Sequence, residues 1–442
     1  MAKAAPQTTA APLTPEQVRQ RVGESGLSPD DLGWRWDLGG AAQPGGVPDF
    51  LRDEVWQHSR RDGGFDGAHD AECAQVAAAI RRDPALVRLI WQAFWRTYQS
   101  PERRPLKAWP TLEPLLGDQA GYFYYLVALA GIPLTQAHHR RLGLPEGVTA
   151  STVQQARVES VPYYSGAHHG RFGVDFPQLE WLSHYTRERY FRLGRLEFWL
   201  EPNRTCPARV YRHRATGRVV ALAPDGMMFA ADGSVYADPA ERRPGTGWTA
   251  SFRADRDAWC GHVISPFGQG TRWQVRLTRS EWQETLRPGD LCLTLHIPNG
   301  GGLTPAACRD SMLRALDFFP RHFPDSLPRG LVSVSWLFNN QLRQAFPAEA
   351  NVVHFLNQFY SVPRPSGPWD GLWFLFLRRG APDFDAWPRD TTPRRQVLDF
   401  LRHHPRWRES AMFLLWEDMV HYGENHYLRT WPAPELGASR PG

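Results

Sequence analysis

The sequence predicts a helical N-terminal domain followed by a mixed α/β domain, on three observations. Before about residue 150, apolar residues recur at helical spacing. After Gly194, short segments rich in β-branched and aromatic residues alternate with turn residues. After about residue 290, strand and helix patterns alternate, which is typical of an α/β fold rather than a β-sandwich. The chain has 442 residues, 42% of them hydrophobic, which is enough for more than one core.

Composition excludes several classes of protein. The net charge of +5 is spread along the chain without a dense basic run, so we expect no nucleic-acid partner. We find neither a signal pattern nor an apolar run that could span a membrane, and expect no membrane association. The five cysteines are scattered, which favours reduced thiols and a cytoplasmic protein. The paired histidines lack metal-site spacing, so we expect no metal. The sequence gives no indication of the oligomeric state.

We expect three segments: a disordered tail over residues 1–13, a helical domain over 14–150 and an α/β domain over 151–435. The tail is rich in Ala, Pro and Thr. The first helix should begin at Thr14, with Gln17 placed to complete a capping box. Further helices are expected at 73–82, 84–98 and 119–130. In the second of these, one apolar residue every fourth position predicts a single buried stripe, formed by Leu86, Ile90, Phe94 and Tyr98.

The α/β domain should begin with a helix that runs from Pro177 to about residue 192 and is stopped by Gly194. Strands are then expected at 195–200, 209–213, 219–223, 227–229, 259–264, 273–277, 291–297 and 331–336. The continuous apolar run 371–377 predicts a buried strand. A late helix is expected to start at 396–402, and apolar periodicity resumes over 410–420.

The segment 291–319 is the most informative part of the chain. It reads as a short apolar strand, a loop with three successive glycines and a helix that Thr304 caps and Pro305 opens. A helix N-terminus behind a glycine loop is a ready anion site, because unpaired N–H groups and the helix dipole meet there. The pyrophosphate of a cofactor would fit this geometry. The alternative is a plain strand–turn–helix connection.

Several short motifs occur in an order that resembles an uncharacterised bacterial family of acyltransferase-domain proteins, which combine a helical N-terminal region with a GNAT-like C-terminal region. The motifs lie at 190–198, 261–266, 295–298, 308–311, 318–319, 335–337 and 351–355, and the resemblance covers roughly residues 120 to 400. The resemblance implies a central mixed sheet and an acyltransferase that uses acyl-CoA as co-substrate and a small-molecule or peptide amine as acceptor.

The resemblance also implies where the pyrophosphate docks. Strand 291–297 would lead into the phosphate loop 298–302, so that the cofactor-binding residues would be Asn299, Gly300, Gly301, Gly302 and Thr304. The segment 351–360 would occupy the place of the late GNAT helix. GNAT loops usually carry an Arg or Gln before their glycines, and this chain has neither there. Phosphate contacts would then rest on backbone amides alone or on a distant Arg. A catalytically inactive GNAT-like module that binds a metabolite or a protein is therefore the alternative function.

Two residues are candidate catalytic bases. His296 ends the strand beside the glycine loop, where it could take a proton from an attacking amine or simply hold the turn. Glu197 alternates with apolar neighbours near the start of the β region, where it could face a cleft or solvent.

Three further residues are candidate substrate contacts. Arg192 and Arg195 flank Gly194 and could bind an anionic group or form an ion pair at a helix end. His262 could face the same cleft. Cys308 lies at a helix start, but its spacing favours a core thiol over a nucleophile.

Overall fold

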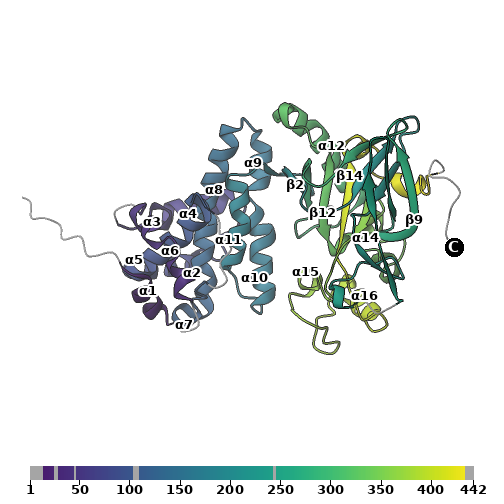
Figure 1. Cartoon of the computed structure of the whole chain (residues 1–442). Coiled ribbons are helices and arrows are strands. Elements are labelled where there is room, and N and C mark those ends of the chain that lie inside the picture. Colours follow the sequence, from purple (N-terminus) through teal and green to yellow (C-terminus); the bar gives the residue numbers. More distant parts are fainter. Residues whose placement is uncertain (1–12, 24–27, 44–45, 103–108, 242–244, 434–442) are drawn as a thin grey trace, which may run out of the picture. The chain divides into compact units, whose positions relative to one another are not determined.

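The computed structural model describes residues 13–23, 28–43, 46–102, 109–241 and 245–433. The chain divides into two compact units, one ending at Glu188 and one beginning at Arg189. This division lies later in the chain than the expected boundary at 150. Of the expected disordered tail, residues 1–12 lie outside the described part. The two units differ in architecture, with helices in the first and strands with helices in the second (Figure 1).

The first unit is built of helices. Its first helix, α1 (Pro15–Val22), has the expected capping box, because Thr14 and Gln17 each accept the other's backbone N–H. The other α-helices are α2 (Pro29–Gly33), α3 (Trp36–Ala41), α4 (Asp53–Asp62), α5 (Asp70–Arg82), α6 (Pro84–Phe94), α7 (Glu113–Leu116), α8 (Ala120–Arg141), α9 (Glu146–Thr152), α10 (Val161–Ala167) and α11 (Phe176–Leu182). Two π-helical turns, η2 (Trp95–Gln99) and η4 (Ala156–Ser160), continue α6 and precede α10.

Helices α6 and α8 form the centre of this unit. Every residue of α6 from Ala85 to Phe94 is buried, as is every residue of α8 from Ala120 to Ile132. The four residues of the predicted apolar stripe, Leu86, Ile90, Phe94 and Tyr98, are buried, and the other faces of α6 are buried as well. A helix that is surrounded by other helices is buried on all sides and is therefore mostly apolar. In α6 the polar residues Arg88 and Gln92 are buried too.

The second unit contains a six-stranded mixed sheet with the order β1-β2-β11-β12-β14-β13. Only β11 and β12 run parallel to each other; the remaining neighbours are antiparallel. Helix α12 (Pro305–His322) packs on one face, where Phe318 contacts Phe191 and Phe319 contacts Phe198. The strands are β1 (Tyr190–Leu193), β2 (Leu196–Pro202), β11 (Leu291–His296), β12 (Gly330–Ser335), β13 (Tyr360–Pro363) and β14 (Ser410–Leu415).

A second sheet has the order β10-β3-β4-β8-β7, with β9 also paired to β8. Its strands are β3 (Arg209–His213), β4 (Val219–Leu222), β7 (Phe252–Ala254), β8 (Ala258–Ser265), β9 (Gln269–Thr278) and β10 (Trp282–Leu286). A two-stranded ribbon joins β5 (Met228–Ala230) to β6 (Gly247–Thr249). The remaining helices of this unit are α13 (Leu342–Ala345), α14 (Asn351–Leu356), α15 (Leu372–Phe376), α16 (Thr392–Leu401) and α17 (His426–Arg429).

Three expected elements are different in the structure. The helix expected from Pro177 to 192 is shorter in the structure, where α11 ends at Leu182 and strand β1 follows. Gly194, with φ of 76°, lies in the turn of the hairpin between β1 and β2 and does not end a helix. The apolar run 371–377 is the short helix α15 rather than a strand. The segment 410–420 is a strand, β14, followed by the 3₁₀ turn η9 (Trp416–His421). Apolar runs of this length fit either a buried strand or a buried helix, so periodicity alone cannot separate them.

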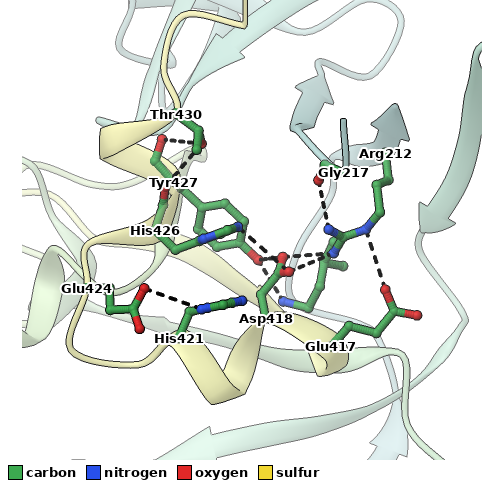
Figure 2. A network of polar contacts seen from close by, with 10 residues as sticks. Arg212, Gly217, Glu417, Asp418, His421, Glu424, His426, Tyr427 and Thr430 are labelled. Carbon is green, nitrogen blue, oxygen red and sulfur yellow. Dashed lines mark hydrogen bonds and ion pairs between the residues drawn. The ribbon is translucent and has the colours of Figure 1, made fainter. Parts of the chain in front are cut away.

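A polar network fastens the C-terminal segment to the second sheet (Figure 2). Asp418 accepts two hydrogen bonds of 2.9 Å from one guanidinium nitrogen of Arg212 and a third from the hydroxyl of Tyr427. That hydroxyl accepts the backbone N–H of Leu415 at the end of β14. His426 lies 3.7 Å from the same carboxylate, and burial lowers the pKa of its imidazole. The buried carboxylate thus joins β3, β14 and α17.

Candidate active site

The hairpin of β1 and β2 is anchored to the start of α12. Ser311 accepts the backbone N–H groups of Arg195 and Leu196 through its hydroxyl, at 2.8 and 3.2 Å. Gly194 makes this approach possible, since a Cβ there would lie 2.9 Å from the Ser311 hydroxyl. The strand that carries Glu197 therefore has a fixed position relative to the helix that follows the glycine loop.

The glycine loop connects β11 to α12 in the way the sequence predicts. Gly300 and Gly301 have φ of 78° and 71°, a backbone conformation that favours glycine. Thr304 caps α12 by accepting the N–H of Ala307. The N–H of Gly300 is taken by the side chain of Asn299. Within the described residues, the amides of Gly301 and Gly302 donate no hydrogen bond to the protein. These exposed amides at a helix start are the groups that bind anions in many proteins.

Arg195 holds the other side of this loop. Its guanidinium donates to the carbonyls of Pro298, Gly301 and Gly302 at 2.8, 3.2 and 3.3 Å. A planar guanidinium with several N–H groups suits this task, because it can engage three carbonyls from one position. Arg195 is therefore a residue that shapes the loop, a role the sequence analysis did not assign to it.

His296 and Glu197 form a hydrogen-bonded pair at the end of β11. Their Cα atoms are directly opposed across β2 and β11, and Nδ1 of His296 lies 2.7 Å from Oε2 of Glu197. Glu197 is fully buried, whereas the His296 side chain is 23% exposed. An ionised carboxylate can only accept, so Nδ1 donates and the lone pair of a neutral imidazole lies on Nε2. This arrangement gives His296 a fixed orientation and a basic nitrogen.

Strands β11 and β12 are paired over only part of their length. The parallel register joins Leu293 to Leu331 and Thr294 to Val332, although both strands continue further. Beyond these pairs, the Ser333 hydroxyl donates to the carbonyl of Leu295 at 2.7 Å. The backbone ladder between the two central strands therefore ends just before His296.

The structure brings some of the candidate residues together and separates others. Arg192 lies opposite Glu197, so that Arg192, Glu197 and His296 form one row across three strands. His262 lies on β8 in the second sheet, where its Nδ1 accepts the N–H of Ser251. It does not share the row of His296.

Other contacts around this row were not anticipated. Tyr190 packs edge-on near His296, with ring centroids 6.3 Å apart, and two-residue alternation from Arg192 could have placed it on the same face. Ser311 and Ser333 make contacts distant in sequence, for which no local signal exists. Cys308 is buried, and burial raises the pKa of its thiol, as befits a core thiol rather than a nucleophile.

Comparison with known domain families adds to this geometry. A family described as GNAT-like C-terminal domain matches residues 190–413, and one described as N-acyltransferase N-terminal domain matches residues 58–187. The chain belongs to this acyltransferase-domain family. The resemblance seen in the sequence motifs is thereby confirmed, as is the fold class of a helical region followed by a GNAT-like mixed sheet.

Solved structures share the fold of this GNAT-like chain. A mutant acyltransferase in complex with octanoyl-CoA is 21% identical, with a TM-score of 0.60, and the match covers 91% of this chain and 99% of the other. An acyltransferase in complex with decanoyl-CoA and teicoplanin is 22% identical, with a TM-score of 0.60 and coverage of 91% and 100%. At this identity the likeness establishes the fold alone. A search of curated proteins finds no match.

Among the described residues, no helix is long and apolar enough to cross a membrane. In the same part of the chain, no group of three or more His, Cys, Asp or Glu side chains could hold a metal ion.

Proposed function

We propose that this protein is an N-acyltransferase that moves an acyl group from acyl-CoA to a primary amine. The observation that carries the proposal is the His296–Glu197 pair, which stands at the end of β11 immediately before the glycine loop and the capped start of α12. A base beside an anion-binding loop is what a direct transfer from a thioester of CoA requires. The acyl-CoA complexes of the solved GNAT-like structures support the same donor.

The pyrophosphate of CoA would lie on the loop from Asn299 to Gly302 and the start of α12, capped by Thr304. Support comes from the uncommitted amides of Gly301 and Gly302 and from the positive end of the α12 dipole. Arg195 has its guanidinium on the loop carbonyls, so in this proposal it maintains the loop rather than holding the phosphates. The unpaired ends of β11 and β12 would leave room for the pantetheine arm.

In the proposed reaction, Nε2 of His296 takes a proton from the acceptor ammonium, with Glu197 stabilising the imidazolium that forms. The free amine then attacks the thioester carbonyl carbon, forming the C–N bond. The C–S bond breaks, and the CoA thiolate leaves and takes up the second proton, which the attacking nitrogen loses as it becomes the amide nitrogen. Holding both reactants in one orientation supplies much of the acceleration.

The first acceptor to test is a glycopeptide with a free primary amine, since one of the solved structures holds teicoplanin together with decanoyl-CoA. Arg192 lies in the same row as His296 and could contact an anionic part of the acceptor. His262, on the other sheet, would contact only a large acceptor. All five cysteines are free thiols, which supports the expected location in the cytoplasm.

A thermal-shift titration with acetyl-CoA, octanoyl-CoA, decanoyl-CoA and free CoA tests the cofactor site. A ligand that binds only the folded state raises the melting midpoint. We expect a shift that Gly301→Val abolishes. Gly289→Val is the matched control, because Gly289 also has a positive φ, of 89°, and a Cβ at either glycine would meet no atom closer than 3.7 Å. Gly289 lies in the turn before β11. No shift with any CoA species in a folded sample would overturn the proposal.

The alternative is a catalytically inactive module that binds a metabolite or a protein partner. The absence of an Arg or Gln before the glycines motivates it. His296→Gln separates the two: an enzyme loses release of CoA in the presence of an acceptor, whereas a binding module has no turnover to lose and keeps its affinity for CoA.

A further inference from the structure

A cavity of about 310 Å³ lies in the second unit, beside the end of the mixed sheet where β13 finishes and β14 begins. Pro363 and Ser410 mark these strand ends, and the turn after β8 and the segment after β12 close the other sides. The cavity is separate from the glycine loop and is lined mainly by polar and charged side chains. Its size is that of a small-molecule site.

Most of the polar groups in this wall already have partners. Arg406 pairs with Glu241 at 2.8 Å, and Arg408 donates to the carbonyl of Val235. Asp232 accepts both the backbone N–H and the hydroxyl of Ser234. These charged groups thus already make contacts within the wall.

Of the five side-chain amides in the wall, those of Asn339 and Gln341 bind each other. Gln341 donates to the carbonyl of Arg406 and accepts from Arg408 and from the side chain of Asn339. The Oδ1 atom of Asn339 accepts the N–H of Gln341 in return. These hydrogen bonds fix the positions of the two amides in the wall.

Two opposite charges remain without such partners. Within the described residues, the Arg364 guanidinium forms no hydrogen bond or ion pair, and the Glu409 carboxylate accepts none. Both side chains line the cavity and both are half-buried. They influence each other, since burial raises the pKa of Glu409 and the charge of Arg364 opposes this rise, but they form no ion pair.

The half-buried position of Glu409 deprives its carboxylate of part of its hydration. Burial raises the pKa of Glu409, with nearby Asp370 adding to this shift. The backbone approaches the same carboxylate closely, because a Cβ on Gly371 would lie 3.3 Å from Oε1. A half-buried charge without a partner costs stability, and such groups are commonly found where a ligand supplies the partner.

We propose that this cavity binds a small zwitterion of the amino-acid type, with its carboxylate on Arg364 and its ammonium on Glu409. Two opposite charges held apart in one rigid wall match a ligand that carries both charges itself. A purely anionic or purely cationic ligand would satisfy one side chain and leave the other unpaired. The site involves none of the residues proposed to act on acyl-CoA, so it stands or falls independently of that reaction.

Ligand-observed NMR on the full-length protein can test this with glycine, β-alanine and γ-aminobutyrate, which place the two charges at increasing separations. We expect saturable binding that is strongest for one member. The amide of that probe, which keeps only the ammonium, and its N-acetyl form, which keeps only the carboxylate, should each bind about ten-fold more weakly or worse.

Two variants assign the contacts. In Arg364→Gln, the probe should bind no more tightly than its amide. In Glu409→Gln, the probe should bind no more tightly than its N-acetyl form. Arg379→Gln is the control, because Arg379 is an exposed arginine that does not line the cavity. A melting midpoint no lower than that of the wild type verifies folding of each variant. Absence of saturable binding up to the solubility limit, equal binding of the three forms, or binding unaffected by both substitutions would overturn the proposal.

Discussion

His296 and Glu197 face each other from neighbouring antiparallel strands, with Nδ1 and Oε2 2.7 Å apart and the carboxylate wholly buried. Because the register is fixed by the sheet, the imidazole cannot turn away without losing this bond. The pair therefore fixes which nitrogen of His296 carries the lone pair. The proposed proton transfer depends on that orientation as much as on the presence of a histidine.

The first prediction concerns this pair. His296→Gln should lower kcat by about 10² to 10⁴, the usual contribution of a positioned base, with little change in KM for acyl-CoA. Glu197→Gln should lower kcat by about ten- to a hundredfold, because the imidazole loses its orienting charge. Steady-state kinetics with an amine acceptor measures both.

Glu201→Gln is the matched control for Glu197→Gln. Glu201 lies further along β2 and accepts a hydrogen bond from Thr294 at 2.7 Å, away from His296. We expect its replacement to leave kcat nearly unchanged. An equal loss of kcat in Glu201→Gln and Glu197→Gln would mean that both carboxylates act by stabilising the sheet, and that Glu197 has no separate role in orienting His296.

The sequence was informative where its signals are local. The capping box at Thr14, the N-cap at Thr304 and the strand before the glycine loop all follow from patterns within a few residues. The pairing of Glu197 with His296 joins residues 99 positions apart, so only the strand register reveals it. The three contacts of Arg195 with the loop are equally remote in sequence. The fold class and the two candidate bases could thus be predicted from the sequence. That the two bases are hydrogen-bonded to each other could be identified only from the strand pairing in the structure.

The second prediction concerns Arg195. Arg195→Lys should raise KM for acyl-CoA several-fold with a smaller effect on kcat, because one ammonium cannot replace a guanidinium that engages three carbonyls. Arg314→Lys is the control, since the guanidinium of Arg314 pairs with Asp310 at 2.7 Å on the exposed side of α12 and does not contact the loop. If both variants raise KM equally, the loop does not depend on Arg195.

The third prediction concerns stability and pH. Burial raises the pKa of Glu409 above its ordinary value of 4.5, so the folded state holds this proton more tightly than the unfolded chain. Stability from this group is present below pH 4.5 and is lost as the pH rises through the folded pKa. Glu409→Gln should therefore raise the free energy of unfolding at pH 7 by about 1 kcal/mol, and the gain should shrink towards pH 4.5.

Urea unfolding of wild type and Glu409→Gln at several pH values measures this difference. Glu349→Gln, at an exposed position, controls for the loss of one negative charge. A variant that is less stable than wild type at pH 7, or a difference that does not vary with pH, would contradict the prediction.

The fourth prediction separates two neighbouring carboxylates that share one arginine. Asp418 is almost fully buried and 2.9 Å from Arg212, whereas Glu417 is 78% exposed and 3.6 Å from it. Asp418→Asn leaves a largely buried guanidinium without its buried counter-ion and should lower the free energy of unfolding by about 3 kcal/mol or more. Glu417→Gln should change it by less than about 1 kcal/mol, as for exposed ion pairs. Urea unfolding measures both, and equal losses would show that the network in Figure 2 does not hold the C-terminal segment through Asp418.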